Sequence, residues 1–64
     1  MGKYDSNIAL ARESLARAER ELGEAVRAMA DAAPEVREAV LGQRRQRVQE
    51  FQEQIETFTW ANNR

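Results

Sequence analysis

The sequence predicts an all-α protein and, within that class, an antiparallel two-helix hairpin that resembles a coiled coil. Three observations support this fold class. Apolar residues recur three and four positions apart along two long segments, which is the spacing of a helix face that packs against another helix. The composition is rich in the strong helix formers Ala, Glu, Arg, Gln and Leu. A single proline separates the two segments.

The first segment carries the repeat in its most regular form. A large apolar residue recurs every seventh position, and an alanine follows it three places later; we assign these two sets to the a and d positions of a helix seam. The sets are Ile8, Leu15, Leu22 and Met29, and Ala11, Ala18, Ala25 and Ala32. The pattern predicts a helix over residues 6–30, with Asp5 or Ser6 capping its first turn through a side-chain oxygen.

The repeat stops at residues 31–33, where we expect a tight turn. Pro34 has no N–H and disfavours helical geometry in Ala33, but proline is well tolerated in the first turn of a new helix. The sequence therefore predicts a second helix over residues 34–61, and residues 1–64 form a single domain.

An antiparallel hairpin with its turn near residue 33 pairs residues whose numbers sum to about 66. The predicted apolar pairs are Ile8 with Phe58, Ala11 with Ile55, Leu15 with Phe51, Ala18 with Val48, and Ala25 with Leu41. Each pair joins an a position to a d position, and three of them place an alanine opposite a branched side chain. Outside the seam, the same register pairs Glu19 with Arg45 and Glu21 with Arg47, which are opposite charges.

The small size of the chain predicts self-association. A hairpin of 64 residues buries little apolar surface, and without cysteine it has no disulfide to stabilise it. We therefore expect an oligomer, specifically a dimeric four-helix bundle. The candidate interface residues are Leu10, Val26, Val36, Val40, Trp60 and Tyr4. Trp60 has two interpretations: it contacts another subunit, or it packs over Tyr4 at the open end of the hairpin.

Two glycines interrupt the predicted helices at nearly the same level, Gly23 and Gly42. Each costs about 1 kcal/mol relative to alanine in a helix interior. Either these outward positions tolerate glycine, or a neighbouring subunit approaches the backbone there.

Two d positions of the second segment hold arginines, Arg37 and Arg44. A buried, unpaired guanidinium is costly, so each must reach solvent, a carboxylate or an anionic ligand. In one interpretation the aliphatic stems pack and the charged ends reach water, Glu19 or Glu24. In the other, the second helix binds a phosphate or an acidic partner surface. The candidate ligand-binding residues are Arg37, Arg44, Arg45 and Arg47.

The residue types present offer no machinery for catalysis. The chain has no histidine or cysteine, so no base activates its hydroxyl groups and zinc lacks its usual ligands. Glu50, Glu53 and Glu56 recur three apart, and we interpret them as a solvated acidic face. We therefore expect no enzyme, no metal and no cofactor.

Charge and hydropathy limit the partners and the location that we expect. Ten basic and eleven acidic residues give a net charge of −1, which argues against holding nucleic acid by bulk charge alone. No apolar run reaches the length of about 20 residues that a membrane span needs, and residues 1–5 lack the hydrophobic region of a signal peptide. We expect a cytoplasmic protein.

The predicted architecture resembles that of small plasmid-encoded RNA-binding hairpins, which pair into antiparallel four-helix bundles with alternating small and large layers. Separately, the closing residues Trp60, Ala61 and Asn62 are similar to the end of short phage-encoded helical hairpins that sequester cyclic nucleotides. The tyrosine and lysine positions of those phage proteins find no match here. These resemblances imply a phage or plasmid origin and a phosphate-bearing ligand, either structured RNA or a cyclic nucleotide.

From the residues themselves we favour a non-enzymatic interaction or adaptor protein that self-associates and binds or sequesters a protein partner. The alternative is the binding of a phosphate-bearing ligand through the arginine cluster.

Overall fold

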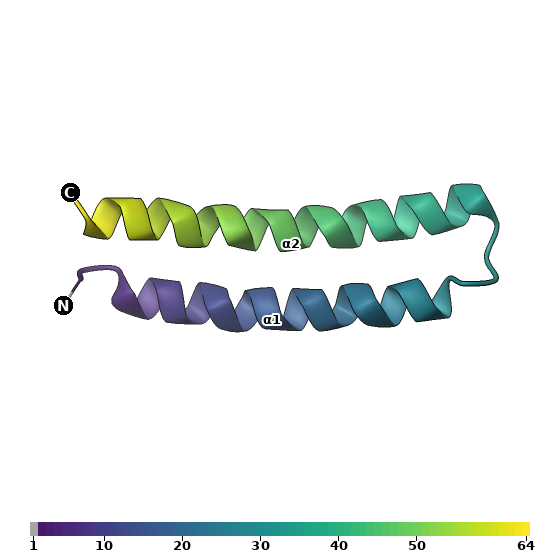
Figure 1. Cartoon of the computed structure of the whole chain (residues 1–64), viewed down its shortest axis with the longest axis horizontal. Coiled ribbons are helices and arrows are strands. Elements are labelled where there is room, and N and C mark those ends of the chain that lie inside the picture. Colours follow the sequence, from purple (N-terminus) through teal and green to yellow (C-terminus); the bar gives the residue numbers. More distant parts are fainter. Residues whose placement is uncertain (1) are drawn as a thin grey trace.

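The computed structural model describes residues 2–64, which form two α-helices joined by a short turn. Helix α1 spans Asp5–Ala28 and helix α2 spans Pro34–Asn62. The helices run antiparallel and side by side, so both chain ends lie at one end of the molecule and the turn lies at the other (Figure 1). The molecule measures 48 × 15 × 9 Å. The prediction of an all-α helical hairpin is confirmed.

The start of α1 differs from the expected cap. Tyr4 occupies the N-cap position, and its side chain makes no capping hydrogen bond. Asp5 lies inside the first turn, where its Oδ2 accepts a hydrogen bond of 2.9 Å from the backbone N–H of Gly2. The prediction that Asp5 or Ser6 caps the helix is therefore wrong. The Asp5 carboxylate still lies near the positive end of the helix dipole, where a negative charge is favourable.

The turn begins earlier than the sequence pattern suggests. Helix α1 ends at Ala28, and the backbone N–H of Ala32 donates to the carbonyl oxygen of Met29 at 3.1 Å, which tightens the chain into the turn. Ala33 has φ −58° and ψ 145°, the extended conformation that a residue before proline favours. Pro34 is the first residue of α2, so the proline lies in the first turn of the helix, as predicted.

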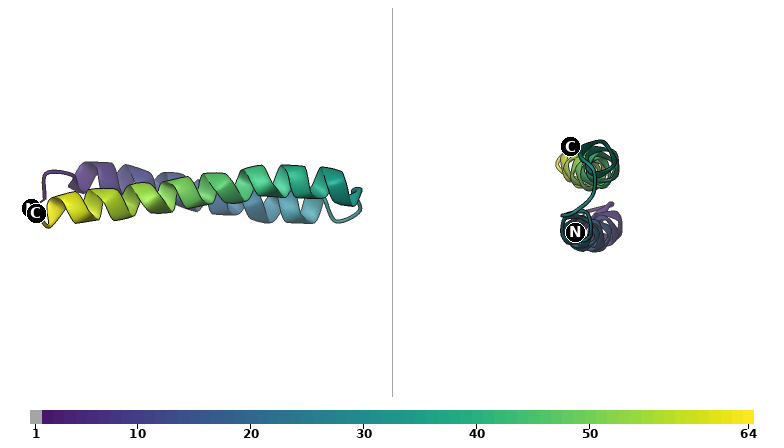
Figure 2. Two further views of the ribbon diagram at one scale, coloured as in Figure 1. Left: turned by 90° about the horizontal axis from the view of Figure 1, so that it is seen from above. Right: turned by 90° about the vertical axis from the view of Figure 1, so that its right-hand side faces the viewer.

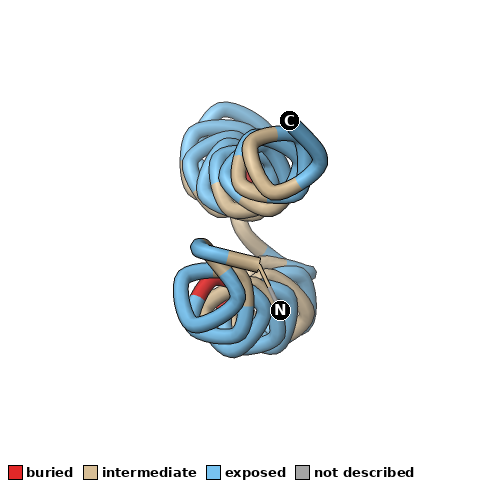
Figure 3. The backbone as a smooth tube through the Cα atoms, turned by 90° about the vertical axis from the view of Figure 1, so that its left-hand side faces the viewer, coloured by how far each residue is buried: buried red, intermediate tan, exposed pale blue. Residues whose placement is uncertain are grey.

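The most buried residues lie where the two helices face each other. Ala11, Ala18 and Leu41 are only 4%, 3% and 5% exposed. The other large seam residues are half-buried: Ile8, Leu15, Leu22, Met29, Val48, Phe51, Ile55 and Phe58. Figure 3 shows the same division, with the less exposed parts of each helix turned toward the other helix. The predicted seam is therefore the side on which each helix packs.

The two helices cross at a shallow angle, which is typical of coiled-coil packing (Figure 2). Residues 2–64 contain two helices and no third element that could cover the edges of the seam, so the large seam side chains keep part of their surface in water. Within residues 2–64, neither helix combines the length and the apolar character that crossing a membrane requires.

The open end of the hairpin is held by a set of contacts that we call the terminal clasp: Gly2, Tyr4, Asp5, Phe58 and Asn62. The backbone N–H of Tyr4 donates to Oδ1 of Asn62 at 2.8 Å, and Nδ2 of Asn62 donates to Oδ1 of Asp5 at 3.0 Å. The Tyr4 ring stacks on Phe58 with a centroid separation of 5.5 Å. A Cβ atom added at Gly2 would lie 2.5 Å from Cγ of Asn62, so the backbone there is packed directly against the amide.

The terminal clasp shows which aromatic residue packs against Tyr4. The partner of Tyr4 is Phe58, whereas Trp60 remains 60% exposed. The interpretation in which Trp60 packs over Tyr4 is therefore wrong.

Replacing Asn62 by alanine should loosen the open end, because the substitution removes both hydrogen bonds of its side chain. We expect Asn62→Ala to lower the free energy of unfolding by about 1–2 kcal/mol, measured by urea denaturation followed by circular dichroism. The matched control is Asn63→Ala, whose side chain is exposed and should change stability by less than about 0.5 kcal/mol. Equal midpoints for the two variants would contradict the clasp.

Candidate functional site

The arginines of α2 reach across the hairpin at the middle of the molecule. Nη1 of Arg44 lies 3.6 Å from Oε2 of Glu21, and Nη1 of Arg47 lies 3.8 Å from the same oxygen. The predicted pairing of Glu21 with Arg47 is confirmed. Arg44 occupies a seam position, and we expected its charged end to reach water, Glu19 or Glu24. It contacts Glu21 instead. Its side chain is 41% exposed, so its stem packs while its charged end reaches the carboxylate at the surface.

The other two candidate arginines are directed elsewhere. Nη1 of Arg45 lies 3.7 Å from Oε2 of Glu38 on the same helix, so the expected pairing with Glu19 is not formed. Nη1 of Arg37 donates a long hydrogen bond of 3.5 Å to the carbonyl oxygen of Ala30, next to the end of α1. The structure therefore brings Arg44 and Arg47 together, whereas Arg37 and Arg45 do not join them.

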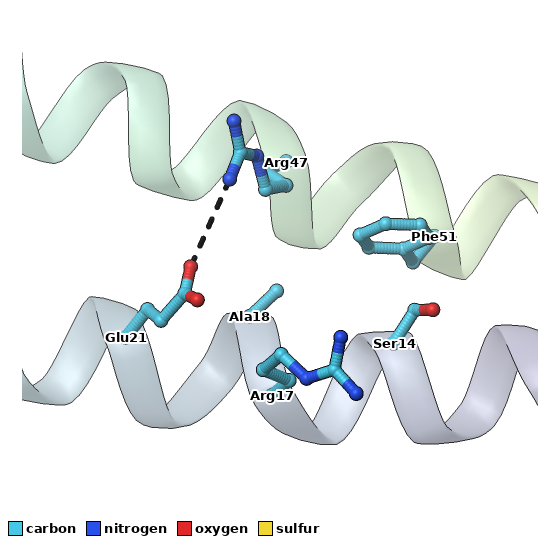
Figure 4. Close-up of a pocket in the computed structure, with 6 residues that line it drawn as sticks. All are labelled: Ser14, Arg17, Ala18, Glu21, Arg47 and Phe51. Carbon is cyan, nitrogen blue, oxygen red and sulfur yellow. Dashed lines mark ion pairs between the residues drawn. The ribbon is translucent and has the colours of Figure 1, made fainter.

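A shallow hollow of about 210 Å³ opens between the helices beside the Glu21 pairs. We call it the seam hollow, and its lining residues are Ser14, Arg17, Ala18, Glu21, Arg47 and Phe51. In Figure 4 the Glu21–Arg47 pair lies on one side of Ala18, and the Phe51 ring and the Ser14 hydroxyl lie on the other. The Arg17 guanidinium extends from α1 toward Ser14 in the same view.

Five of the six residues that line this hollow were not among the predicted site residues: Ser14, Arg17, Ala18, Glu21 and Phe51. A signal for them exists in the sequence. Ser14 precedes Ala18 by four positions and Arg17 precedes Glu21 by four positions, so these residues lie on the same side of α1. That side faces Arg47 in the predicted register, and Phe51 follows Arg47 by one helical turn. The space beside Ala18 depends on how the two helices pack, and the sequence pattern does not specify it.

The electrostatics of the hollow favour an anion. Two guanidinium groups, those of Arg17 and Arg47, and one carboxylate, that of Glu21, line the hollow. Arg44 does not line it, but it contacts the same Glu21 carboxylate and adds a further positive charge nearby. Within residues 2–64, Arg17 forms no ion pair. The result is a local surplus of positive charge on a chain whose net charge is −1. Because the Arg44, Arg47 and Glu21 side chains are 41%, 57% and 38% exposed, each pair contributes only about 0.2–1 kcal/mol to stability.

The acidic residues of α2 do not gather into a metal site. In the part of the chain that the structure describes, no group of three His, Cys, Asp or Glu side chains is arranged to hold a metal ion. Of the three glutamates with helical spacing, Glu53 accepts a hydrogen bond of 3.2 Å from Nε2 of Gln49 on the same helix.

The candidate interface residues differ in accessibility. Leu10, Val26, Val36 and Trp60 are 63%, 48%, 52% and 60% exposed, and Val40 is half-buried. Tyr4 is half-buried and engaged in the terminal clasp, so it has little surface left for a partner. The guanidinium carbon of Arg64 lies 4.7 Å from the centroid of a Trp60 ring, which covers one face of the indole. The exposed residues lie toward both ends of the hairpin.

Both helix glycines lie in open surroundings. A Cβ atom added at Gly42 would meet no atom within 4 Å, and one added at Gly23 would meet only Nη1 of Arg27 at 3.9 Å. Packing within the hairpin therefore gives no reason for glycine at either position.

No protein-family model matches this chain, and comparisons with curated proteins and with solved structures also give no match.

Replacing Arg44 by leucine should be tolerated, because it extends the apolar seam at a half-buried position and removes a weak ion pair. We expect Arg44→Leu to raise the free energy of unfolding by up to about 1 kcal/mol, read from urea denaturation. Arg45→Leu, at an exposed position outside the seam, is the control and should have no such effect. A loss of more than about 1 kcal/mol in Arg44→Leu would instead make the Glu21 contact a structural requirement.

Proposed function

We propose that the chain is a non-enzymatic cytoplasmic interaction protein that self-associates as a four-helix bundle and binds or sequesters a protein partner. The observation that carries this proposal is the incomplete burial of the hairpin. Only Ala11, Ala18 and Leu41 of the described residues are buried, and no side chain is wholly enclosed. Four larger apolar side chains have about half or more of their surface exposed.

The accessible surface area supports a second copy as the first partner. The hairpin exposes 4998 Å², whereas a compact monomer of 7.3 kDa exposes about 4,200 Å². The excess of about 800 Å² is similar to the area that each partner loses in a standard protein–protein interface. A second hairpin would cover this excess and the half-buried edges of the seam.

The glycines add support for close approach of another helix. Gly23 continues a column of small residues at seven-residue spacing that is separate from the seam: Ala9 and Ala16 on α1, and Ala30 in the turn that follows α1. The predicted register places Gly42 nearly level with Gly23 on the other helix. A Cβ atom added at either glycine would meet no closer contact than 3.9 Å. Small residues are the type that lets two helix backbones pack closely. We propose that an oligomer contact accounts for glycines that the single hairpin does not need.

Sedimentation equilibrium tests the self-association directly. We expect a dimer mass at micromolar concentration, and we expect the double variant Leu10→Ser/Val36→Ser to dissociate to monomers without losing helix, because both side chains are exposed. The control is Gln46→Ser, another exposed position, which should remain dimeric. A folded, compact monomer of the natural sequence throughout the micromolar range would reject the proposal.

A second candidate function, the binding of a phosphate-bearing ligand such as structured RNA or a small nucleotide, is supported by one specific observation. Arg44 and Arg47 share the single carboxylate of Glu21, and Arg17 stands beside them without an ion pair within residues 2–64. Arginine matches phosphate geometry well and provides several N–H donors.

A further inference from the structure

We propose that the seam hollow binds a nucleoside monophosphate, with the phosphate between Arg17 and Arg47 and the base against the Phe51 ring. This inference rests on the second candidate function and deepens it, because it assigns a position and a ligand class. Of its contact residues, only Arg47 belongs to the arginine cluster that the sequence suggests.

The charges at the hollow favour a phosphate monoester, which carries about −1.5 to −2 at pH 7. Arg17, Arg47 and Glu21 line the hollow and leave one surplus positive charge, and Arg44, which contacts Glu21 without lining the hollow, adds a second one nearby. Arg47 is free to turn toward such a ligand, because its contact with Glu21 is 3.8 Å long and its side chain is 57% exposed. Three phosphate oxygens offer Arg17 and Arg47 separate acceptors, whereas Arg44 and Arg47 now share one carboxylate oxygen.

The position of Phe51 favours a ligand with a flat ring. Phe51 follows Arg47 by four residues on α2, which is about 6 Å along the helix axis. This rise is comparable with the distance across a ribose from its phosphate to its base. The Phe51 ring lines the hollow, and stacking of a base on an aromatic side chain contributes about 1–3 kcal/mol.

Two small residues complete the site. Ala18 lines the hollow with only a methyl group, so the space between Arg47 and Phe51 remains open. The Ser14 hydroxyl lies on the same side of Ala18 as the Phe51 ring, where it offers a hydrogen bond to the sugar or the base (Figure 4).

A nuclear magnetic resonance titration of the full ¹⁵N-labelled chain with adenosine 5′-monophosphate tests the site. We expect saturable shifts centred on the amides of residues 14–21 and 47–51, and an affinity that falls with added salt. Arg17→Gln and Arg47→Gln should each weaken binding at least about fivefold. The matched control is Arg20→Gln, an exposed arginine on the same helix that does not line the hollow, which should change affinity less than about twofold.

Separate probes distinguish the two halves of the ligand. We expect adenosine alone and inorganic phosphate alone to bind at least about tenfold more weakly than the nucleotide. Phe51→Leu keeps an apolar side chain in the seam and should reduce nucleotide affinity to that of inorganic phosphate. Circular dichroism and sedimentation of each variant verify the fold and the oligomeric state.

The outcomes separate the site from the broader function. Equal losses in Arg17→Gln and Arg20→Gln would show diffuse charge attraction and overturn the site. Nucleotide binding no tighter than that of inorganic phosphate would overturn the contact with Phe51. If millimolar nucleotide shifts no hollow residue while structured RNA binds elsewhere in a salt-dependent way, the proposed site fails and the second candidate function survives. If neither ligand binds, both fail.

Discussion

The close approach of two helices along a seam of alanines is the constraint on which the rest of the structure depends. No third layer covers the two helices of residues 2–64, so a side chain becomes buried only where the backbones of α1 and α2 come close together. Ala11 and Ala18 meet this condition because a methyl group allows the second helix to approach. The same small side chains leave space beside them, and the seam hollow is the consequence at Ala18.

The two ends of the hairpin define its register in different ways. At one end, the extended Ala33 and the following proline reverse the chain within a few residues. At the other, Asn62 bridges the backbone of Tyr4 and the carboxylate of Asp5. The ion pairs between these ends are long and exposed, so they contribute less to the register than the packed seam does.

Much of this fold could be predicted from the sequence, because a seven-residue repeat and a single proline leave few arrangements open. The predicted register agrees with the burial of Leu41 and with the contact of Glu21 with Arg47. The individual side-chain contacts were harder to predict, because the seven-residue repeat does not specify which hydrogen bonds and ion pairs a polar side chain forms. The predicted register sets Asn62 opposite Tyr4, but it does not specify that the amide bridges the Tyr4 backbone and the Asp5 carboxylate. Arg45 contacts Glu38 on its own helix and not Glu19, which the register pairs with it. The seam hollow depends on volumes left between packed side chains, which a pattern of residue types does not specify.

The chain folds back on itself within one molecule, and the distance between two spin labels at the open end of the hairpin measures this fold-back. Labels on cysteines introduced at Ser6 and Thr59 occupy exposed positions at the open end of the hairpin. We expect a distance below about 25 Å, in keeping with a molecule 15 Å across in its second dimension, and the distance should persist when labelled protein is refolded with an excess of unlabelled chains. A distance near 80 Å, as expected for about 53 residues of one continuous helix, would contradict it. So would a short distance that disappears on dilution with unlabelled chains.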